Sequence, residues 1–419
     1  MAEKALLVTV DFDKRGSWPI EDVAKELEDL VVSCGGEVVW RTVARCKKPT
    51  PGYLIGEGKV EEIADVCRTA GVDTVIFSHD LKGSQQRNLE EAVKTKTIDR
   101  TQLILDIFAR RAKSEEGKMQ VELAQLEYLL PRLVGKGIEL SRLGGGIGTV
   151  GPGETKLEVD RRRISERITR LKRDLKEVSV SRRLKRKKRT DQNVPSISLV
   201  GYTNAGKSTL LNSLTNAGQL TFDGLFTTLD PLSRQYILPT HQKVILSDTV
   251  GFMYELPHHL IEAFKATLEE VVDADLLLHV LDVSNPKFRN LHDAVIDVLK
   301  ELNCQDKPTI TVLNKIDKLT DKSWLRNLEE SFPNVVSISA LKKENLSALT
   351  GKINEVLVPT TTLIDVEIPI GRMDLINLIH KEGEVKRVDY SGDFVRIRAV
   401  VSFKLASQLA AVKGIKSAS

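Results

Sequence analysis

The sequence predicts an α/β protein of several domains, because two stretches of alternating strand and helix flank a long helical segment. Residues 1–98 and 193–359 alternate β-rich runs with helical ones, an order that builds parallel sheets covered by helices. Residues 99–192 place apolar side chains at helical spacing among many charges. Residues 360–419 add a strand, a helix and a hairpin pattern. We therefore expect an N-terminal α/β subdomain, a helical hairpin, a larger α/β domain and a small C-terminal α/β domain.

The N-terminal part predicts a small parallel sheet with helices on it. Runs rich in β-branched and aromatic residues indicate strands at 5–10, 37–43 and 74–78. Apolar residues at helical spacing indicate helices at 20–33 and 58–69. Each of these helices ends close to a glycine, as the C-terminal cap of a helix commonly does.

The second part predicts two long helices that form an antiparallel hairpin. Its first half carries the apolar residues Leu103, Ile107, Val121, Leu126, Leu129 and Leu133. The second helix runs from about Glu158 to Arg189 and has an apolar face of Ile164, Ile168, Leu171, Leu175 and Val178. The spacings of three and four residues place these side chains on one face of a helix.

The loop between the two helices, residues 142–158, reads R-L-G-G-G-I-G-T-V-G-P-G-E-T-K-L-E and has six glycines between 144 and 153. A loop that only turns the chain needs one or two glycines, so this one suggests close approach to a ligand or macromolecule. A flexible connector is the alternative interpretation. A G-x-G-x-x-G match can be found here, but no strand precedes it, so we reject a dinucleotide site.

The net charge of +4 hides a strongly basic segment. Residues 161–190 contain fifteen Lys and Arg against three Asp and Glu, so the other 389 residues sum to −8. A basic block in an otherwise acidic chain usually meets a polyanion. A solvated helix or linker is the alternative interpretation of the charge run alone.

Composition narrows the class of protein. No apolar run is long enough to span a bilayer, and the first residues indicate a strand and not a signal peptide. The four cysteines are scattered and include no C-x-x-C pair. That distribution argues against a zinc site or a disulfide framework and indicates a reducing cytoplasm.

A phosphate-binding loop is predicted where the strand 197–200 runs into G-Y-T-N-A-G-K-S. This is the pattern G-x-x-x-x-G-K-S, with a strand before it and a helix, 209–216, after it. In such a loop the backbone N–H groups wrap the phosphates, the lysine reaches the β- and γ-oxygens, and the final hydroxyl ligates Mg²⁺. The expected nucleotide contacts are Gly201, Tyr202, Thr203, Asn204, Ala205, Gly206, Lys207, Ser208 and Thr209.

Two later segments complete the predicted phosphate and metal site. The segment 225–230, L-F-T-T-L-D, offers Thr228 as a second hydroxyl ligand of Mg²⁺. The strand 244–247 delivers Asp248 to the metal through water, and the N–H of Gly251 faces the γ-phosphate. The residues expected here are Phe226, Thr227, Thr228, Leu229, Asp230, Asp248, Thr249, Val250 and Gly251. Lys207, Thr228 and Gly251 are the expected catalytic groups.

Two motifs at strand ends predict that the base is guanine. The strand 309–313 ends in N-K-I-D, where Asp317 can accept hydrogen bonds from N1–H and the 2-amino group, Asn314 reads the base edge and Lys315 lies over the ring. A carboxylate aimed at two donors penalises adenine, which lacks both. S-A-L at 339–341 offers a backbone N–H to guanine O6. The base site therefore comprises Asn314, Lys315, Ile316, Asp317, Ser339, Ala340 and Leu341, and we expect a GTPase with Mg²⁺.

The residue after Gly251 raises a question about hydrolysis. Asp248 to Gly251 has the form D-x-x-G, and many GTPases place a water-positioning glutamine or histidine just beyond that glycine. Here Phe252 and Met253 follow, and neither can orient a water molecule. Catalysis by a GTPase is mostly positioning and charge neutralisation. A partner or a second cation can therefore replace the missing polar side chain. We expect slow intrinsic hydrolysis that a partner accelerates.

With these residues identified, the chain resembles the HflX GTPases, a branch of the translation-factor-related P-loop GTPases, over essentially its whole length. The specific marks are Y-L-I-G-E-G-K-V-E-E at 53–62, R-L-G-G-G-I-G-T-V-G-P-G-E-T-K-L-E-V-D-R-R-R-I at 142–164 and F-T-T-L-D-P at 226–231. These proteins more often have alanine at the position of Thr227, which leaves the expected metal ligand, Thr228, unaffected.

The resemblance implies binding to the large ribosomal subunit, with the glycine-rich loop reaching ribosomal RNA near the peptidyl-transferase centre. It also implies splitting of stalled or hibernating ribosomes under stress, by a protein that we expect to be a cytoplasmic monomer, with peripheral membrane association also considered. Expected RNA contacts are Gly144, Gly145, Gly146, Arg182, Arg183, Lys185, Arg186, Lys187, Lys188 and Arg189. Asn204 stands where potassium-activated GTPases carry asparagine, so its amide is a candidate K⁺ ligand; a purely structural role in the loop is the alternative.

Two other functions compete with this interpretation. A GTPase of ribosome or tRNA maturation would carry other partner domains, and we find no folate-type module or motif for RNA chemistry in the sequence. An RNA-remodelling NTPase would use ATP in the N-terminal domain. There, G-E-G-K at 56–59 is too short for a P-loop, although ATP binding without a P-loop remains an alternative.

Overall fold

The computed structural model describes residues 2–13, 18–133, 152–191, 194–215, 225–226, 232–240, 242–254, 265–357, 361–402, 405–406, 409 and 416–417. The chain divides into two compact units. The first comprises residues 1–180 together with 222–230 and 256–266, and the second comprises 181–221, 231–255 and 267–419. Each unit has its own sheets and hydrophobic clusters.

The first unit contains a four-stranded parallel sheet in the order β2-β1-β3-β4. Its strands and helices are β1 (Lys4–Asp11), α1 (Ile20–Ser33), β2 (Glu37–Arg45), α2 (Glu57–Ala70), β3 (Thr74–Phe77), α3 (Gly83–Val93), β4 (Lys96–Asp99) and α4 (Arg100–Arg111). The three predicted strands and two predicted helices are confirmed. The sequence patterns missed α3 and β4, which complete the alternation.

Glycine ends the second helix as its sequence predicts. Gly71 caps α2 with φ +60°, a left-handed conformation that glycine adopts without steric cost. Between α2 and the sheet, buried aliphatic and aromatic side chains form one cluster, which includes Leu6, Ile63 and Phe77. The small N-terminal sheet therefore has a core of its own.

The helical region differs from the two long helices that were expected. The first half forms two helices, α4 and α5 (Glu115–Leu133), because the chain at Ala112 turns to an extended conformation with φ −61° and ψ 114°. Helix α4 buries Ile104 and Phe108 and belongs to the layers of the N-terminal sheet. Apolar periodicity continues through both helices, so it does not mark the break between them.

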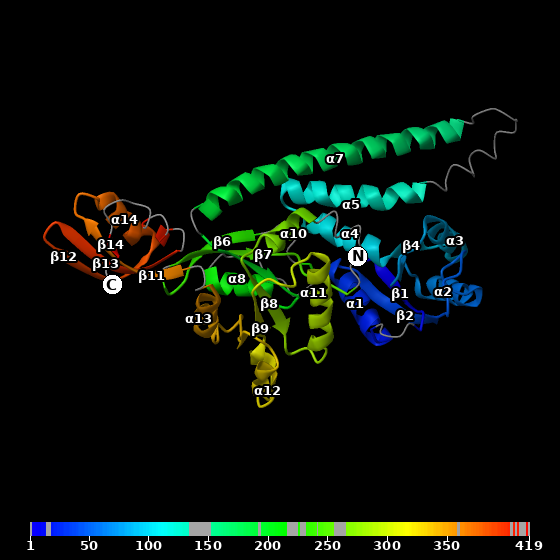
Figure 1. Cartoon of the computed structure of the whole chain (residues 1–419). Helices are drawn as coiled ribbons and strands as arrows, with labels where there is room; N and C mark the ends of the chain where they lie inside the picture. Colours follow the sequence, from blue (N-terminus) through cyan, green and yellow to red (C-terminus); the bar gives the residue numbers. More distant parts are fainter. Residues whose placement is uncertain are drawn as a thin grey trace. The chain divides into compact units, whose positions relative to one another are not determined.

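In the first unit, α5 lies side by side with the part of α7 (Pro152–Asp191) that precedes Ser181 (Figure 1). The predicted apolar face of the second helix packs on α5 in a cluster of Leu123, Ile168, Leu171 and Leu175, with Ile164 at its edge. Arg167 forms a bidentate pair with Glu122, both nitrogen–oxygen distances being 2.7 Å. Helix α7 begins at Pro152, so residues 152–158, which were predicted as the end of the glycine-rich loop, are helical, while residues 134–151 lie outside the described residues.

The second unit contains a six-stranded sheet in the order β10-β9-β8-β5-β7-β6, in which only β6 is antiparallel to its neighbour. Its elements are β5 (Ser196–Val200), α8 (Lys207–Thr215), β6 (Leu232–Ile237), β7 (Lys243–Asp248), α10 (Lys265–Val272), β8 (Leu276–Asp282), α11 (Phe288–Glu301), β9 (Thr309–Asn314), the short 3₁₀ helix η1 (Ile316–Lys318), α12 (Leu325–Glu330), β10 (Val335–Ser337) and α13 (Leu346–Leu357).

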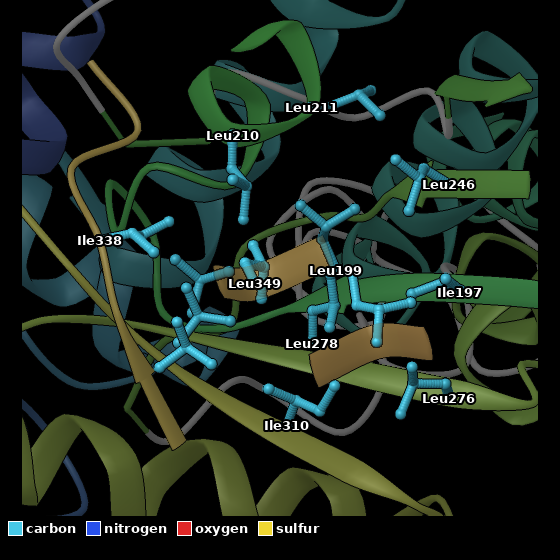
Figure 2. Packing of buried hydrophobic residues seen from close by; sticks show 14 of the residues in the cluster. Ile197, Leu199, Leu210, Leu211, Leu246, Leu276, Leu278, Ile310, Ile338 and Leu349 are labelled. Carbon is cyan, nitrogen blue, oxygen red and sulfur yellow. The ribbon is translucent and has the colours of Figure 1, made fainter. Parts of the chain in front are cut away.

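The core of this unit lies at the centre of the six-stranded sheet. Leu199 of β5, Leu278 of β8 and Leu349 of α13 are fully buried and lie close together in Figure 2. The central strands are apolar on both faces because helices cover parallel sheets on both sides. Their carboxyl ends therefore meet at one edge, which is where open α/β sheets bind ligands.

The last part of the chain forms an antiparallel sheet in the order β12-β13-β11-β14. Its elements are β11 (Thr361–Pro369), α14 (Met373–Glu382), β12 (Glu384–Ser391), β13 (Phe394–Ser402) and β14 (Lys416–Ser417). The predicted strand, helix and hairpin are confirmed, and Gly392 turns the hairpin with φ +56°. Only the two-residue strand β14 was not predicted.

In the part of the chain that the structure describes, no helix has the length and apolar character that a membrane crossing requires.

Candidate nucleotide-binding site

The phosphate-binding loop joins the end of β5 to the start of α8, as the sequence predicts. Two of its glycines are required by close contacts. A methyl group on Gly201, whose φ is +152°, would lie 2.4 Å from the carbonyl oxygen of Val280. A methyl group on Gly206, with φ +97°, would lie 2.3 Å from Nδ2 of Asn314. The loop is thus pressed against β8 and β9, and only glycine fits at either position.

Lys207 is buried at the base of the loop with 6% of its surface exposed. Its Nζ donates hydrogen bonds to the carbonyl oxygens of Gly201 at 3.0 Å and Tyr202 at 2.8 Å. Burial lowers the pKa of Lys207 to about 8, and the charge of Lys315 acts in the same direction, while Asp248 opposes both. The ammonium group is therefore held inside the loop, where phosphate oxygens can replace the water that burial removes.

The predicted Mg²⁺ ligands Ser208 and Asp248 converge from different elements. Ser208 is the second residue of α8, Asp248 ends β7, and the Ser208 hydroxyl donates to Oδ2 of Asp248 across 2.6 Å. The neighbouring Thr249 hydroxyl donates to the carbonyl oxygen of Leu199 at 2.7 Å, which fixes the chain directly after the carboxylate. Oxygen ligands from a hydroxyl and a carboxylate suit a hard cation such as Mg²⁺.

Within the described residues, no three His, Cys, Asp or Glu side chains are grouped so that they could hold a metal ion. The Ser208 hydroxyl and the Asp248 carboxylate fit Mg²⁺ in the way common for nucleotide enzymes, in which the substrate phosphates and water complete the shell. The other expected ligand, Thr228, lies outside the described residues, as do Thr227, Leu229 and Asp230.

Asn314 connects the predicted base site to the phosphate loop. Its Nδ2 donates to the carbonyl oxygen of Ala205 at 2.9 Å, and its Oδ1 accepts from the N–H of Ala340 at 3.0 Å. This amide therefore ties three segments of the site together: the loop, the end of β9 and the S-A-L segment. The sequence assigned it only to the base edge, and that contact stays a prediction.

Lys315 and Asp317 are both fixed by neighbours in the described structure. The Lys315 ammonium lies 2.7 Å from Oδ2 of Asp282 and donates to the carbonyl oxygen of Asn204 at 2.8 Å. Oδ1 of Asp317 accepts a 2.7 Å hydrogen bond from the Ser339 hydroxyl. That hydrogen bond is the main reason that the pKa of Asp317 is lowered, so the carboxylate stays ionised and able to accept hydrogen bonds from a base.

Phe252 and Met253 are buried, each with 1% of its surface exposed. The backbone of Phe252 pairs with the phosphate loop: its N–H donates to Gly201 at 3.1 Å, and its carbonyl accepts from the N–H of Thr203 at 2.8 Å. The sequence predicted that Phe252 lacks a catalytic role, but this backbone pairing was missed. Periodicity and motif spacing carry no signal for such a contact.

Phe226, one of the expected nucleotide-site residues, is placed in the first unit. Its ring is 1% exposed and packs edge-on against Phe108, with ring centroids 4.6 Å apart. The N–H of Leu225 donates to the Ser33 hydroxyl at 3.1 Å. In this structure Phe226 is therefore a packed core residue of the first unit, and its contact with nucleotide stays a prediction.

The expected RNA contacts lie mostly beyond the described side chains. Gly144, Gly145 and Gly146 fall outside the described residues. The basic block lies on helix α7, and only Arg182 among its expected contacts has a described side chain, which is partly exposed. Asp282, which the sequence did not single out, belongs to the site because it ends β8 at the same sheet edge as the motifs; its place after a buried strand is the signal that could have found it.

Three family models match the chain in order. Residues 21–109 match the model described as GTP-binding GTPase N-terminal, and residues 111–189 match GTP-binding GTPase Middle Region. Residues 196–315 match the model described as 50S ribosome-binding GTPase. These matches span both units and include the phosphate loop and the start of the N-K-I-D segment.

Curated relatives agree with these matches. The chain is 44% identical over 407 residues to GTPase HflX of Caldanaerobacter subterraneus subsp. tengcongensis, covering 97% of this chain and 93% of the relative. It is 46% identical over 339 residues to GTPase HflX of Escherichia coli, and the match covers 81% of this chain and 79% of that relative. A GTP-binding protein from the archaeon Sulfolobus solfataricus, solved in complex with GDP, is 27% identical with a TM-score of 0.45, covering 85% and 99%.

Proposed function

Because the chain belongs to the HflX family of GTPases, we propose that it binds the large ribosomal subunit and hydrolyses GTP there to split stalled or hibernating ribosomes. GTP binding and hydrolysis are the activity of the family. The ribosomal target is supported by the match of residues 196–315 to a 50S ribosome-binding GTPase and by the basic segment of α7. A protein with that partner acts in the cytoplasm, and we propose that it does so as a monomer.

One observation carries the assignment of GTP to this site. The hydrogen bonds of Asn314 join the phosphate loop to the segment that holds Ser339, and Ser339 in turn orients the Asp317 carboxylate. Phosphate recognition and base recognition are therefore parts of one connected structure at the carboxyl ends of β5 and β9. An ionised carboxylate at the base site favours guanine, whose N1–H and 2-amino group are donors.

The residues of this chain act on GTP mainly by positioning and by charge. The amides of the loop hold the phosphates, and the Lys207 ammonium balances the charge that develops on them during transfer. We expect the Gly251 N–H to face the γ-phosphate. Ser208, Asp248 and Thr228 would hold Mg²⁺, which would neutralise charge on the phosphates.

Phe252 cannot supply the polar group that orients the attacking water, so the chain requires help from outside its own side chains. We propose two sources. The large subunit provides the missing group in trans, in the way that partners of other GTPases raise hydrolysis by about 10³–10⁵-fold. The Asn204 amide would hold K⁺, which would supply further positive charge to the site.

Sedimentation with purified ribosomes and subunits tests the proposal. With a non-hydrolysable GTP analogue the protein should pellet with large subunits, and with GTP it should convert intact ribosomes into subunits. Large subunits should also raise the rate of GTP hydrolysis. Replacement of Gly144, Gly145 and Gly146 by alanine should lower splitting without changing GTP affinity, because alanine restricts the backbone of the loop. Binding that is the same with every nucleotide and with either subunit would contradict the proposal.

A further inference from the structure

The carboxylate of Asp99 is fully buried in the first unit, at the point where β4 passes into α4. Its Oδ1 accepts hydrogen bonds from the N–H of Gln102 at 2.9 Å and from the hydroxyl of Tyr128 at 2.8 Å. Its Oδ2 accepts from the N–H of Leu81 and from Nη2 of Arg132, both at 3.0 Å. One carboxylate therefore joins β4, α4 and the segment after β3 to two side chains of α5.

Arg132 adds further contacts from the last turn of α5. Its Nη2 also donates to the carbonyl oxygen of Leu81 at 2.7 Å, and its Nη1 donates to the carbonyl oxygen of Tyr128 at 2.9 Å. The guanidinium lies over the Tyr128 ring, 3.4 Å from its centroid, in a cation–π arrangement. Burial and the charge of Asp99 raise the pKa of Tyr128, so its hydroxyl stays protonated and remains a donor. A planar guanidinium reaches all of these partners in one orientation only, so the last turn of α5 is held in one place.

The backbone of α5 also lies directly against α3. A methyl group built on Gly83, the first residue of α3, would lie 3.0 Å from Cα of Arg132 and 3.3 Å from its Cβ. Carbon atoms in good contact are about 3.5–4.0 Å apart, so a larger residue at this position would push the end of α5 away from α3. Gly83 therefore permits the close approach that the hydrogen bonds of Arg132 require.

This attachment lies at the end of α5 from which the predicted glycine-rich loop follows. Helix α5 ends at Leu133, the residue after Arg132, and residues 134–151 come next in the chain. On its other side α5 contacts α7 through the cluster of Leu123 and through the ion pair of Glu122 with Arg167. Helix α5 is thus held between α7 and the layers of the N-terminal sheet, and the attachment to the sheet is made at the start of the loop.

We infer that Arg132, anchored by Asp99, is a positioning residue for ribosome splitting, because it fixes the end of α5 from which the glycine-rich loop starts. The N-terminal sheet is then the support of that loop. The inference rests on the proposed function, which assigns the loop to ribosomal RNA. A loop that must displace part of a partner works from a fixed base, since a loose base yields in its place. Loss of the attachment should therefore slow splitting and leave binding to the large subunit unchanged.

Two variants of the full chain loosen the attachment in different ways. Gly83→Ala removes no charge and no hydrogen-bonding group, and it displaces the end of α5 by a few tenths of an ångström. Arg132→Lys keeps a positive charge beside Asp99, but one ammonium cannot replace the planar fork. In both, the maximal rate of ribosome splitting with GTP should fall about 2- to 30-fold, the range of coupling in such side-chain networks. The half-saturating concentration and GTP hydrolysis with large subunits should stay unchanged. Gly351→Ala is the control, because this glycine of α13 has open space around its Cα.

Hydrogen exchange at the amides of the last turn of α5 supplies a second readout that needs no ribosomes. Exchange should be slow in the unaltered protein and in Gly351→Ala, and faster in Gly83→Ala and Arg132→Lys, because the end of the helix opens more often. Unchanged splitting rates, a lower affinity for the large subunit that accounts for the whole loss, or slow exchange in both variants would each overturn the role of Arg132 while the proposed function stands. If the unaltered protein does not split ribosomes, the proposed function itself fails, and the inference fails with it.

Discussion

The hydroxyl oxygen of Ser208 lies 2.6 Å from Oδ2 of Asp248, although forty positions separate the two residues in the chain. Strand β7 brings the carboxylate to the loop because its parallel pairing with β5 places Asp248 beside Leu199. Both oxygens are already at hydrogen-bonding distance, so a Mg²⁺ ion that binds through water to Asp248 and directly to Ser208 requires little rearrangement.

Ser208→Ala should therefore remove the dependence of GTP hydrolysis on Mg²⁺. We expect turnover at saturating Mg²⁺ to fall by about 10²-fold or more, since a bound metal contributes several kcal/mol to charge stabilisation. Ser331→Ala is the control, because the Ser331 hydroxyl bonds only to a carbonyl of its own helix, at 2.7 Å. Turnover measured against Mg²⁺ concentration decides the question. Normal Mg²⁺-dependent turnover in Ser208→Ala would contradict the assignment.

Lys207 should make nucleotide affinity depend on pH above neutrality. Its pKa is lowered to about 8, so above pH 8 the free protein loses the proton that phosphate binding requires. Binding must then take up a proton, and the dissociation constant for GDP should rise toward tenfold per pH unit. Below pH 8 the ammonium is already present and affinity should level off.

Calorimetric titrations between pH 7 and 9.5, in buffers of different ionisation enthalpy, measure this proton uptake directly. Lys207→Arg is the matched control, because a guanidinium stays charged throughout this range. It should bind more weakly than the original residue but without the pH dependence. If the unaltered protein binds GDP with the same affinity across this pH range, the charge of the Lys207 ammonium does not contribute to phosphate binding.

Asp317→Asn should damage the choice of base and not the binding of phosphates. The substitution replaces an acceptor by a donor opposite N1–H, so the preference for GTP over ATP should fall by at least about tenfold. Ser339→Ala removes the hydrogen bond to Asp317 and should weaken GTP binding by less, about 2- to 10-fold. Competition between GTP and ATP measures both effects.

Asp321→Asn serves as the control for this pair. Asp321 is a neighbouring exposed carboxylate whose pKa is also lowered by hydrogen bonds, in its case from Ser323. It should leave base selectivity unchanged. If Asp317→Asn and Asp321→Asn behave alike, Asp317 does not read the base.

The placement of the candidate-site motifs at strand ends could be predicted because each motif follows a strand that is recognisable by its own composition. Ser196–Val200 and Thr309–Asn314 are short runs rich in aliphatic and β-branched residues, and their carboxyl ends must meet at one sheet edge when the strands are parallel. Strand β4 was missed because K-T-I-D has only four residues, and its two β-branched residues, Thr97 and Ile98, stand between charged ones.

Contacts between residues that are far apart in the sequence but close in the folded structure could not be predicted. Tyr202 and Tyr254 are 52 positions apart, and nothing in either segment indicates that a hydroxyl of one meets an N–H of the other. The placement of Phe226 against Phe108 has the same character, since a phenylalanine beside a threonine pair fits a nucleotide-binding segment equally well. Motifs identify chemistry, whereas such packing follows from the whole tertiary structure.

The basic end of α7 should carry the affinity for ribosomal RNA. Replacement of Arg186, Lys187 and Lys188 by alanine should weaken binding to large subunits. It should also reduce the slope of log affinity against log salt by about one for each phosphate that is no longer neutralised. Replacement of Lys381, Lys386 and Arg387, which removes the same charge from the C-terminal domain, is the control. Equal effects of the two triple variants would indicate general attraction and no specific contact.

Asn204 should decide whether potassium stimulates hydrolysis, and its backbone determines how the experiment must be designed. Its φ of +60° is a left-handed conformation, which alanine adopts at a cost of about 1–2 kcal/mol and glycine at none. Asn204→Gly therefore removes the amide without straining the loop, and the backbone carbonyl that accepts from Lys315 at 2.8 Å is kept. Asn204→Asp tolerates the same φ and retains a side-chain oxygen.

Steady-state GTP hydrolysis with large subunits should be faster in K⁺ than in Na⁺ for the unaltered protein and for Asn204→Asp. For Asn204→Gly it should be equal in the two salts. A potassium preference that persists in Asn204→Gly would assign this residue to the shape of the loop alone.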